Sequence, residues 1–166
     1  VMDFSKPGAP RMVRTDINAS LEEAIELSLV AMRKNGIKIE KSLAPGLPKC
    51  YADPHLIEQV VLNLITNAAR AMEKTNGSPK LVAIKSAAHD NTISIQVADS
   101  GPGVPAELGE KIFDPFFTTK EDGSGIGLNI AQRIVADHNG AITLGRSQWG
   151  GAEFTIELPI ERRINN

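Results

Sequence analysis

The stretch Asp99-Ser-Gly-Pro-Gly103, together with the later stretch Gly123-Ser-Gly-Ile-Gly127, decides how this sequence folds and what it binds. The first predicts a carboxylate at a strand end followed by a turn. The second predicts a glycine-rich loop that enters a helix, where unpaired N–H groups and the helix dipole both favour an anion such as phosphate. In this order the two stretches predict a nucleotide site.

Asp99 follows the apolar run 93–98, which predicts a strand. Two roles are open for its carboxylate: it caps the following turn, or it binds a purine base. Gly101 and Gly103 favour the base, because glycine lets the backbone approach a ring closely. A carboxylate can accept from the adenine amine, whereas guanine O6 would face it with lone pairs. Adenine is therefore the expected base.

The upstream stretch Asn63-Leu-Ile-Thr-Asn67 places two amides one turn apart on one helix face. Buried amides are usually satisfied by backbone partners, so a structural role and a ligand role are both open. Arg70 shares the face and could reach a phosphate. Amide oxygens are weak Mg²⁺ ligands that leave water and phosphate oxygens to complete the coordination. Asn67 is the better candidate for the metal.

The segment between the two glycine stretches contains Phe113-Asp-Pro-Phe-Phe117 and Lys120. Its aromatic residues either fold back on the core or anchor a lid that closes over nucleotide. Lys120 either touches a β- or γ-phosphate or remains a solvated surface lysine. The second glycine stretch is not a dinucleotide fingerprint, because a polar segment and not an apolar strand precedes it. It also lacks the Gly-Lys-Ser/Thr ending of a P-loop.

The bulk properties exclude several classes of protein. A formal net charge of −2 without a basic stripe argues against nucleic-acid binding. Cys50 is the only cysteine, so no disulfide forms within the chain, and a small buried residue is favoured over a redox role. No apolar run approaches the roughly 20 residues of a membrane helix. We expect a cytoplasmic domain without direct membrane contact, either as a separate protein or as the cytoplasmic part of a membrane-bound one.

Three helices are expected from periodicity and capping signals. Ser20-Leu-Glu-Glu23 has the pattern of a capping box that starts the first helix, and Gly36 fits its end. Asp53-Pro54 predicts the start of the second helix, as N-cap and first-turn proline. Its expected buried stripe is Ile57, Val60, Val61, Leu64, Ile65 and Ala68. The third helix is expected over 125–138.

Strands are expected at 14–18, 37–43, 81–86, 92–98, 141–144 and 153–159. Strands and helices mix without strict alternation, which favours an α+β two-layer sandwich. The folded domain is expected over 13–160. Residues 1–12 hold two prolines and a glycine and predict a linker that leads from another domain, and 161–166 predict a tail.

Four motifs, in order, resemble the N, G1, F and G2 boxes of the catalytic ATP-binding domain of sensor histidine kinases. They are Asn-x-x-x-Asn, Asp-x-Gly-x-Gly, Phe-x-Pro-Phe-Phe and Gly-x-Gly-x-Gly. The stretch 112–120 is similar to the nitrogen-regulatory type. The resemblance covers about 13–160 and extends to the gyrase, MutL-type and heat-shock chaperone ATPases. It implies a Bergerat-type fold with a mixed sheet of about five strands and three main helices on one face.

The resemblance implies roles for individual residues. Asn67 would bind Mg²⁺, and Asn63 would contact a neighbouring phosphate or water. Arg70 and Lys120 would hold phosphates, and Asp99 would bind the adenine amine. The nucleotide pocket would also include Gly101, Gly103, Ile112, Phe117, Gly123, Ser124, Gly125, Ile126, Gly127 and Leu128. Where this family often has Thr or Ser, the chain has Ala152, so a water-mediated adenine contact does not carry over.

The resemblance further implies a protein-histidine kinase domain that binds Mg-ATP and transfers the γ-phosphoryl group. Hydrolysing relatives resemble one another in a Glu base where this chain has Asn63, and an amide cannot take a proton at neutral pH. The acceptor would be a histidine on a separate helical-hairpin domain, since His55, His89 and His138 do not fit that role. We therefore expect no autophosphorylation of this chain alone. The resemblance implies two partners. One is the missing dimerisation and phosphoacceptor domain that carries this histidine, of which residues 1–12 would be the linker remnant, and the other is a response regulator receiver domain. The alternatives are an ATP-hydrolysing module and a pseudokinase docking module.

Overall fold

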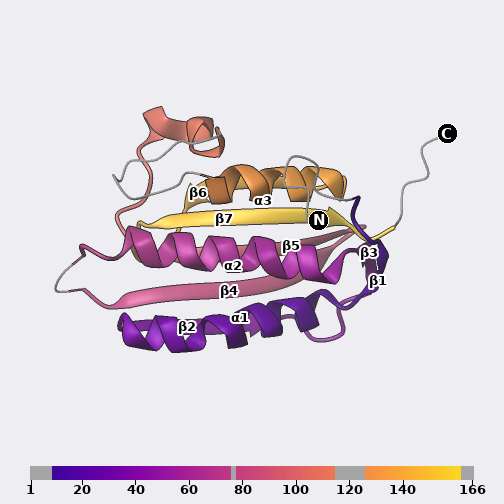
Figure 1. Cartoon of the computed structure of the whole chain (residues 1–166), viewed down its shortest axis with the longest axis horizontal. Helices are drawn as coiled ribbons and strands as arrows, with labels where there is room; N and C mark the ends of the chain where they lie inside the picture. Colours follow the sequence, from indigo (N-terminus) through magenta and orange to yellow (C-terminus); the bar gives the residue numbers. More distant parts are fainter. Residues whose placement is uncertain (1–8, 76–77, 115–125, 162–166) are drawn as a thin grey trace, which may run out of the picture.

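The computed structural model describes residues 9–75, 78–114 and 126–161. Its helices are α1 (Ile17–Lys34), α2 (Pro54–Ala71), the 3₁₀ helix η1 (Ala106–Phe113) and α3 (Ile126–Asp137). Its strands are β1 (Val13–Thr15), β2 (Ile37–Leu43), β3 (Cys50–Ala52), β4 (Lys80–His89), β5 (Thr92–Asp99), β6 (Ala141–Arg146) and β7 (Ala152–Pro159). In Figure 1 the three α-helices lie side by side across one face of the main sheet. The expected two-layer α+β sandwich is confirmed.

The main sheet has five strands in the order β2-β4-β5-β7-β6. β2 and β4 are parallel, with Ile37 opposite Lys80, and the other neighbouring strands are antiparallel. The mixed five-stranded sheet is as predicted, and so is the hairpin of β4 and β5. β5 is the central strand. Its last residue, Asp99, therefore lies between β4 and β7, at one end of the strands.

The core lies between the sheet and the helices. Alternate residues of β5 face the helices, as the period of a strand requires, and Ile93, Ile95 and Val97 are buried. The predicted stripe of α2 is buried in full: Ile57, Val60, Val61, Leu64, Ile65 and Ala68. Burial of this stripe fixes which face of α2 remains available for polar side chains. None of the helices in the described ranges is long and apolar enough to cross a membrane.

The start of α1 differs from the prediction. The helix begins at Ile17, and Asp16 is its N-cap, with its side chain accepting from the Ala19 N–H at 3.3 Å. The capping box at Ser20 is therefore wrong: Ser20 is buried one turn inside the helix and donates to the carbonyl of Pro54 at 3.2 Å. Asp16 and Ser20 are both of N-cap type, and the helix begins after Asp16, which allows Ile17 to be buried.

Two short elements were not predicted. β3 pairs with β1 in a separate antiparallel ribbon, with Val13 opposite Ala52. A three-residue strand is too short to show a period in sequence. η1 lies where the pattern is broken by glycine and proline, and it has a kink at Gly109. Cys50, in β3, is buried, and burial raises the pKa of its thiol to about 11, which fits a structural residue and not a redox centre.

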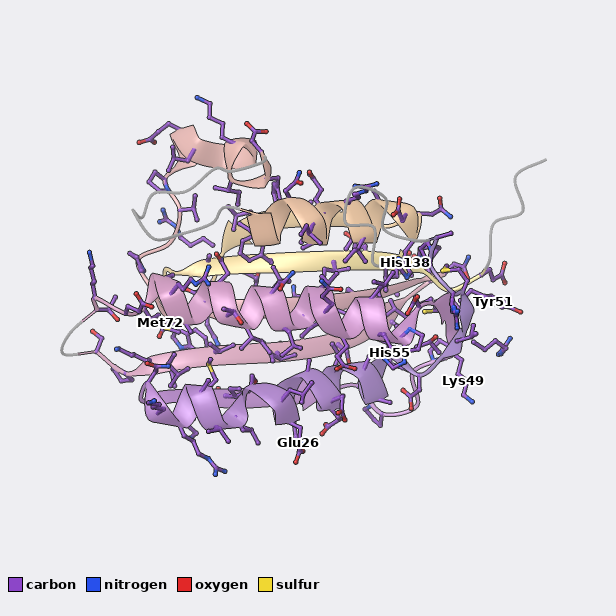
Figure 2. The ribbon with its side chains drawn as sticks, in the orientation of Figure 1. Glu26, Lys49, Tyr51, His55, Met72 and His138 are labelled. Atoms are coloured by element: carbon purple, nitrogen blue, oxygen red, sulfur yellow. The ribbon has the colours of Figure 1, made fainter. Side chains whose placement is uncertain are left out.

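His138 connects three segments at one end of the helical layer. Its side chain is buried, Nδ1 donates to the Ile134 carbonyl at 2.7 Å, and Nε2 accepts from the Asp53 N–H at 3.0 Å. The Asp53 carboxylate caps α2 as predicted and also accepts from the Arg11 N–H at 2.9 Å. In Figure 2, His138 and His55 lie toward one end of the helices and Met72 lies toward the other. The end of α3, the start of α2 and the entering chain are therefore held together.

Replacing His138 with alanine is expected to lower the free energy of unfolding by about 2 kcal/mol, because the buried Asp53 N–H loses its acceptor and a cavity opens. Urea denaturation followed by circular dichroism measures this loss. The matched control is His89→Ala, at the exposed end of β4, which should change the unfolding free energy little. Equal effects of the two substitutions would contradict the bridging role.

Candidate functional site

The Asp99 carboxylate lies at the end of the central strand and is 3% exposed. Its Oδ1 accepts two backbone hydrogen bonds, from Gly101 N–H at 2.9 Å and from Ala152 N–H at 3.2 Å. None of the described residues donates to Oδ2. Burial raises the pKa of this carboxyl above its ordinary value, and the two N–H donors oppose that rise. Oδ1 is thus held by the backbone, and a ligand role for Oδ2 remains a prediction.

The glycines around Asp99 allow three backbone segments to meet. Gly103 has φ +80°, and a Cβ built there would lie 2.8 Å from the Gly150 carbonyl oxygen. At Gly101 a Cβ would lie 3.1 Å from Asp99 Oδ1 and 3.2 Å from Met72 Cγ. Gly101 therefore lies against Asp99, and Gly103 lies against the backbone of Gly150 and Gly151. Whether they shape an adenine pocket remains a prediction.

The turn between β6 and β7 lies against Asp99, a contact that the sequence did not predict. A Cβ on Gly151 would lie 2.5 Å from Asp99 Oδ1 and would also overlap the Asp99 backbone carbonyl. Ala152, discussed only for its missing hydroxyl, donates its N–H to Asp99, and buried Ser147 donates its hydroxyl to the Asp99 carbonyl at 2.6 Å. The only hint in the sequence was the Gly150-Gly151 pair, since backbone donors leave no side-chain signal.

The first amide of α2, that of Asn63, lies near the start of α3. Gly127 is the second residue of α3, and a Cβ there would lie 4.0 Å from Asn63 Cγ. Asn67 follows one turn later, and both asparagines are half-buried. In the part of the chain that the structure describes, no hydrogen bond uses either side-chain amide. Asn63 thus lies near the N-terminus of a helix, where an anion is favoured, and the ligand role of both amides remains a prediction.

The remaining predicted residues divide into several groups. Arg70 is exposed on the last turn of α2, on the same face as Asn63 and Asn67. Ile112 is buried in the core, and Leu128 is half-buried against it. Ile126 is the first residue of α3. Five predicted residues lie outside the described ranges: Phe117, Lys120, Gly123, Ser124 and Gly125.

Phe113 follows the first of its two alternatives and folds back on the core. It is 6% exposed, and its ring meets Phe154 edge-on, with centroids 6.2 Å apart and an interplanar angle of 83°. Its carbonyl accepts from the Asn129 side chain at 3.2 Å, which ties η1 to α3. The later aromatic residues of the segment, Phe116 and Phe117, lie outside the described residues, so a lid anchored by them stays a prediction.

A magnesium ion fits this donor set only together with nucleotide. Among the described residues, no group of three or more His, Cys, Asp or Glu side chains could hold a metal. Two amide oxygens at i and i+4 can supply at most a weak partial shell, and Mg²⁺ commonly completes its octahedron with phosphate oxygens and water. The residues present are therefore compatible with a metal that arrives with a triphosphate.

Comparison with known proteins gives concordant results. The family described as "Histidine kinase-, DNA gyrase B-, and HSP90-like ATPase" matches residues 52–162. The chain is 34% identical over 160 residues to the C4-dicarboxylate transport sensor protein DctS of Rhodobacter capsulatus, a match that covers 96% of the chain and 24% of DctS. It spans about a quarter to a third of the curated relatives that it matches.

Solved structures agree with the sequence matches. The catalytic domain of histidine kinase ThkA is 32% identical, with a TM-score of 0.80 over 91% of this chain and 97% of that one. Full-length ShkA is 31% identical, with a TM-score of 0.81 over 95% of this chain and 33% of that one. These matches cover 91% and 95% of this chain. The chain therefore belongs to the histidine kinase-, DNA gyrase B- and HSP90-like ATPase family, as the ATP-binding catalytic domain of a sensor histidine kinase.

Proposed function

We propose that this domain binds Mg-ATP and transfers the γ-phosphoryl group to a histidine on a separate helical-hairpin domain. The observation that best supports this is the Asp99 carboxylate, with Oδ1 held by two backbone N–H groups and Oδ2 open to a donor. The exocyclic amine of adenine is such a donor, whereas guanine offers a carbonyl oxygen at that position. In support, the ShkA structure is described as a complex with AMPPNP, an ATP analogue.

In this proposal the phosphates lie between α2 and the start of α3. Asn63 lies near Gly127 at the start of α3, Asn67 follows one turn later on α2, and the N-terminus of α3 favours negative charge. Asn67 would coordinate the metal, with Asn63 on a neighbouring phosphate or water, and Arg70 and Lys120 would neutralise phosphate charge. Bound Mg²⁺ would supply charge neutralisation and orient the phosphates for in-line transfer.

Transfer is favoured over hydrolysis because Asn63, the first of the two polar residues on α2, is an amide. Activation of water needs a base that can take a proton, and Asn63 cannot do so at neutral pH. Phosphoryl transfer to an external nucleophile depends mostly on positioning and charge neutralisation. His138 is excluded as the acceptor because it is buried and both of its ring nitrogens are engaged.

We further propose two protein partners. The first is the dimerisation and phosphoacceptor domain of the same full-length kinase, to which the segment 1–12 would lead. The second is the receiver domain of a response regulator. A structure of ThkA, 30% identical to this chain, is described as a complex with the response regulator protein TrrA, which supports a partner of the same class here.

Incubation with γ-labelled ATP tests the transfer step. We expect no label on any histidine of this chain alone, and labelling of a sensor-kinase helical-hairpin domain added in trans. Label on His55, His89 or His138 of the isolated chain would contradict the proposal. A phosphate-release assay in the absence of acceptor separates the alternative, because an ATP-hydrolysing module would turn over steadily while a kinase domain would not.

A further inference from the structure

The Ser147 hydroxyl forms the centre of a small network beside Asp99. Ser147 directly follows β6 and is 5% exposed. Its Oγ donates to the Asp99 carbonyl at 2.6 Å and accepts from Gly151 N–H at 3.0 Å and Trp149 N–H at 3.2 Å. The Ser147 N–H also donates to the Gly151 carbonyl at 2.8 Å. The single hydroxyl proton of Ser147 is therefore committed to the backbone of Asp99.

This network controls both ends of the Asp99 residue. The Asp99 carbonyl is held directly by Ser147, and the carboxylate is held by the N–H of Ala152, the residue after Gly151. The turn lies so close to Asp99 that no side chain fits at Gly151. A change in the path of this turn would therefore rotate the carboxylate or release Oδ1 from one of its two donors.

We propose that Ser147 is a positioning residue for adenine recognition, which sets the direction of Asp99 Oδ2 by fixing the Asp99 carbonyl and the turn 147–151. This inference rests on the proposed role of Asp99 toward the adenine amine. Ser147 itself need not touch the nucleotide. Its hydroxyl acts through backbone groups of the turn and of Asp99, which lies 48 residues away in the sequence.

The test compares two nucleotides on Ser147→Ala. ATP and purine riboside triphosphate have the same sugar and phosphates, but the second lacks the amine that Asp99 would bind. We expect the Kd for ATP, measured by calorimetry with Mg²⁺, to rise roughly three- to tenfold, as for the loss of one hydrogen bond. The Kd for purine riboside triphosphate should stay nearly unchanged. A purely structural role would weaken both nucleotides alike.

Two further variants make the comparison interpretable. Ser86→Ala is the matched control, because Ser86 is similarly buried and hydrogen-bonded, donating to Asn18 Oδ1 at 2.7 Å and accepting from Ala44 N–H at 3.0 Å. It should leave the ratio of the two Kd values unchanged. Ser147→Cys keeps most of the volume but donates weakly; it should shift the ratio as alanine does, and it decides the test if Ser147→Ala does not fold.

A double-substitution cycle separates this inference from the proposed function. If Ser147 acts through Asp99, adding Ser147→Ala to Asp99→Asn should not lower ATP affinity further. Equal weakening of both nucleotides by Ser147→Ala, or no change in either, would overturn the positioning role while the adenine role of Asp99 stands. If Asp99→Asn alone leaves ATP affinity unchanged, the proposed adenine recognition fails, and this inference fails with it.

Discussion

Replacing Asp99 with asparagine is expected to weaken ATP binding by roughly 30-fold, the range for losing a hydrogen bond to a charged group. The asparagine oxygen must take the place of Oδ1, where the N–H groups of Gly101 and Ala152 point. Its NH₂ group then occupies the Oδ2 position and faces the adenine amine, donor against donor. Calorimetry with ATP measures the loss. Unchanged affinity would show that the carboxylate only caps the turn.

The same substitution is expected to leave the fold intact and to raise its stability at neutral pH. Burial raises the pKa of Asp99 in the folded state, so the ionised carboxylate is less favourable there than in the unfolded chain. The unfavourable ionisation lowers the free energy of unfolding at pH values above the folded-state pKa. This loss of stability disappears as the pH falls through that pKa. Unfolding free energies from urea denaturation should therefore be higher for Asp99→Asn at pH 7. The difference should shrink as the pH falls; a less stable variant at pH 7 would contradict this balance.

Replacing Gly151 with alanine is expected to reduce ATP affinity at least about tenfold and to cost about 1–3 kcal/mol of stability, as for overpacking. The added Cβ would lie 2.5 Å from Asp99 Oδ1 and 2.8 Å from the Asp99 carbonyl carbon. Two of the three atoms that it would meet belong to the backbone, so movement of the Asp99 side chain alone cannot relieve the overlap. The turn or the end of β5 must shift, and Oδ1 loses its Ala152 donor.

Gly145→Ala is the matched control for this substitution. Gly145 lies in β6, and a Cβ there would come no closer than 4.0 Å to the Glu153 carbonyl oxygen. It should change neither ATP affinity nor the melting temperature appreciably, so calorimetry and thermal unfolding of both variants isolate the effect of position. Wild-type ATP affinity in Gly151→Ala would show that the close approach of the turn to Asp99 is not needed for binding.

Much of the fold could be predicted because its signals are local. The buried stripe of α2, its cap at Asp53 and the hairpin of β4 and β5 follow from spacing within one element. The start of α1 was predicted wrongly because Asp16 and Ser20 both have N-cap character, and only tertiary burial of Ile17 decides between them. β3 exists through its pairing with β1, which no local pattern records.

The candidate site can be predicted from sequence where a role needs a particular side chain, and not where it depends on the backbone. Asp99 is such a side chain, and the two roles considered for it are compatible. Its Oδ1 accepts the Gly101 N–H, as in a turn cap, while no residue in the described ranges donates to Oδ2. The roles of Ser147 and Gly151 could not be predicted, because they depend on contacts with a strand end about fifty residues earlier. The roles of Lys120 and of the glycines at 123 and 125 remain predictions.

The most direct test of an adenine-selective site at Asp99 is calorimetric titration of this chain with ATP and with GTP, each with and without Mg²⁺. We predict that ATP binds, that Mg²⁺ strengthens its binding, and that GTP binds at least about tenfold more weakly because its O6 would face the Asp99 carboxylate. Equal affinity for ATP and GTP, or no detectable binding of ATP, would contradict the account.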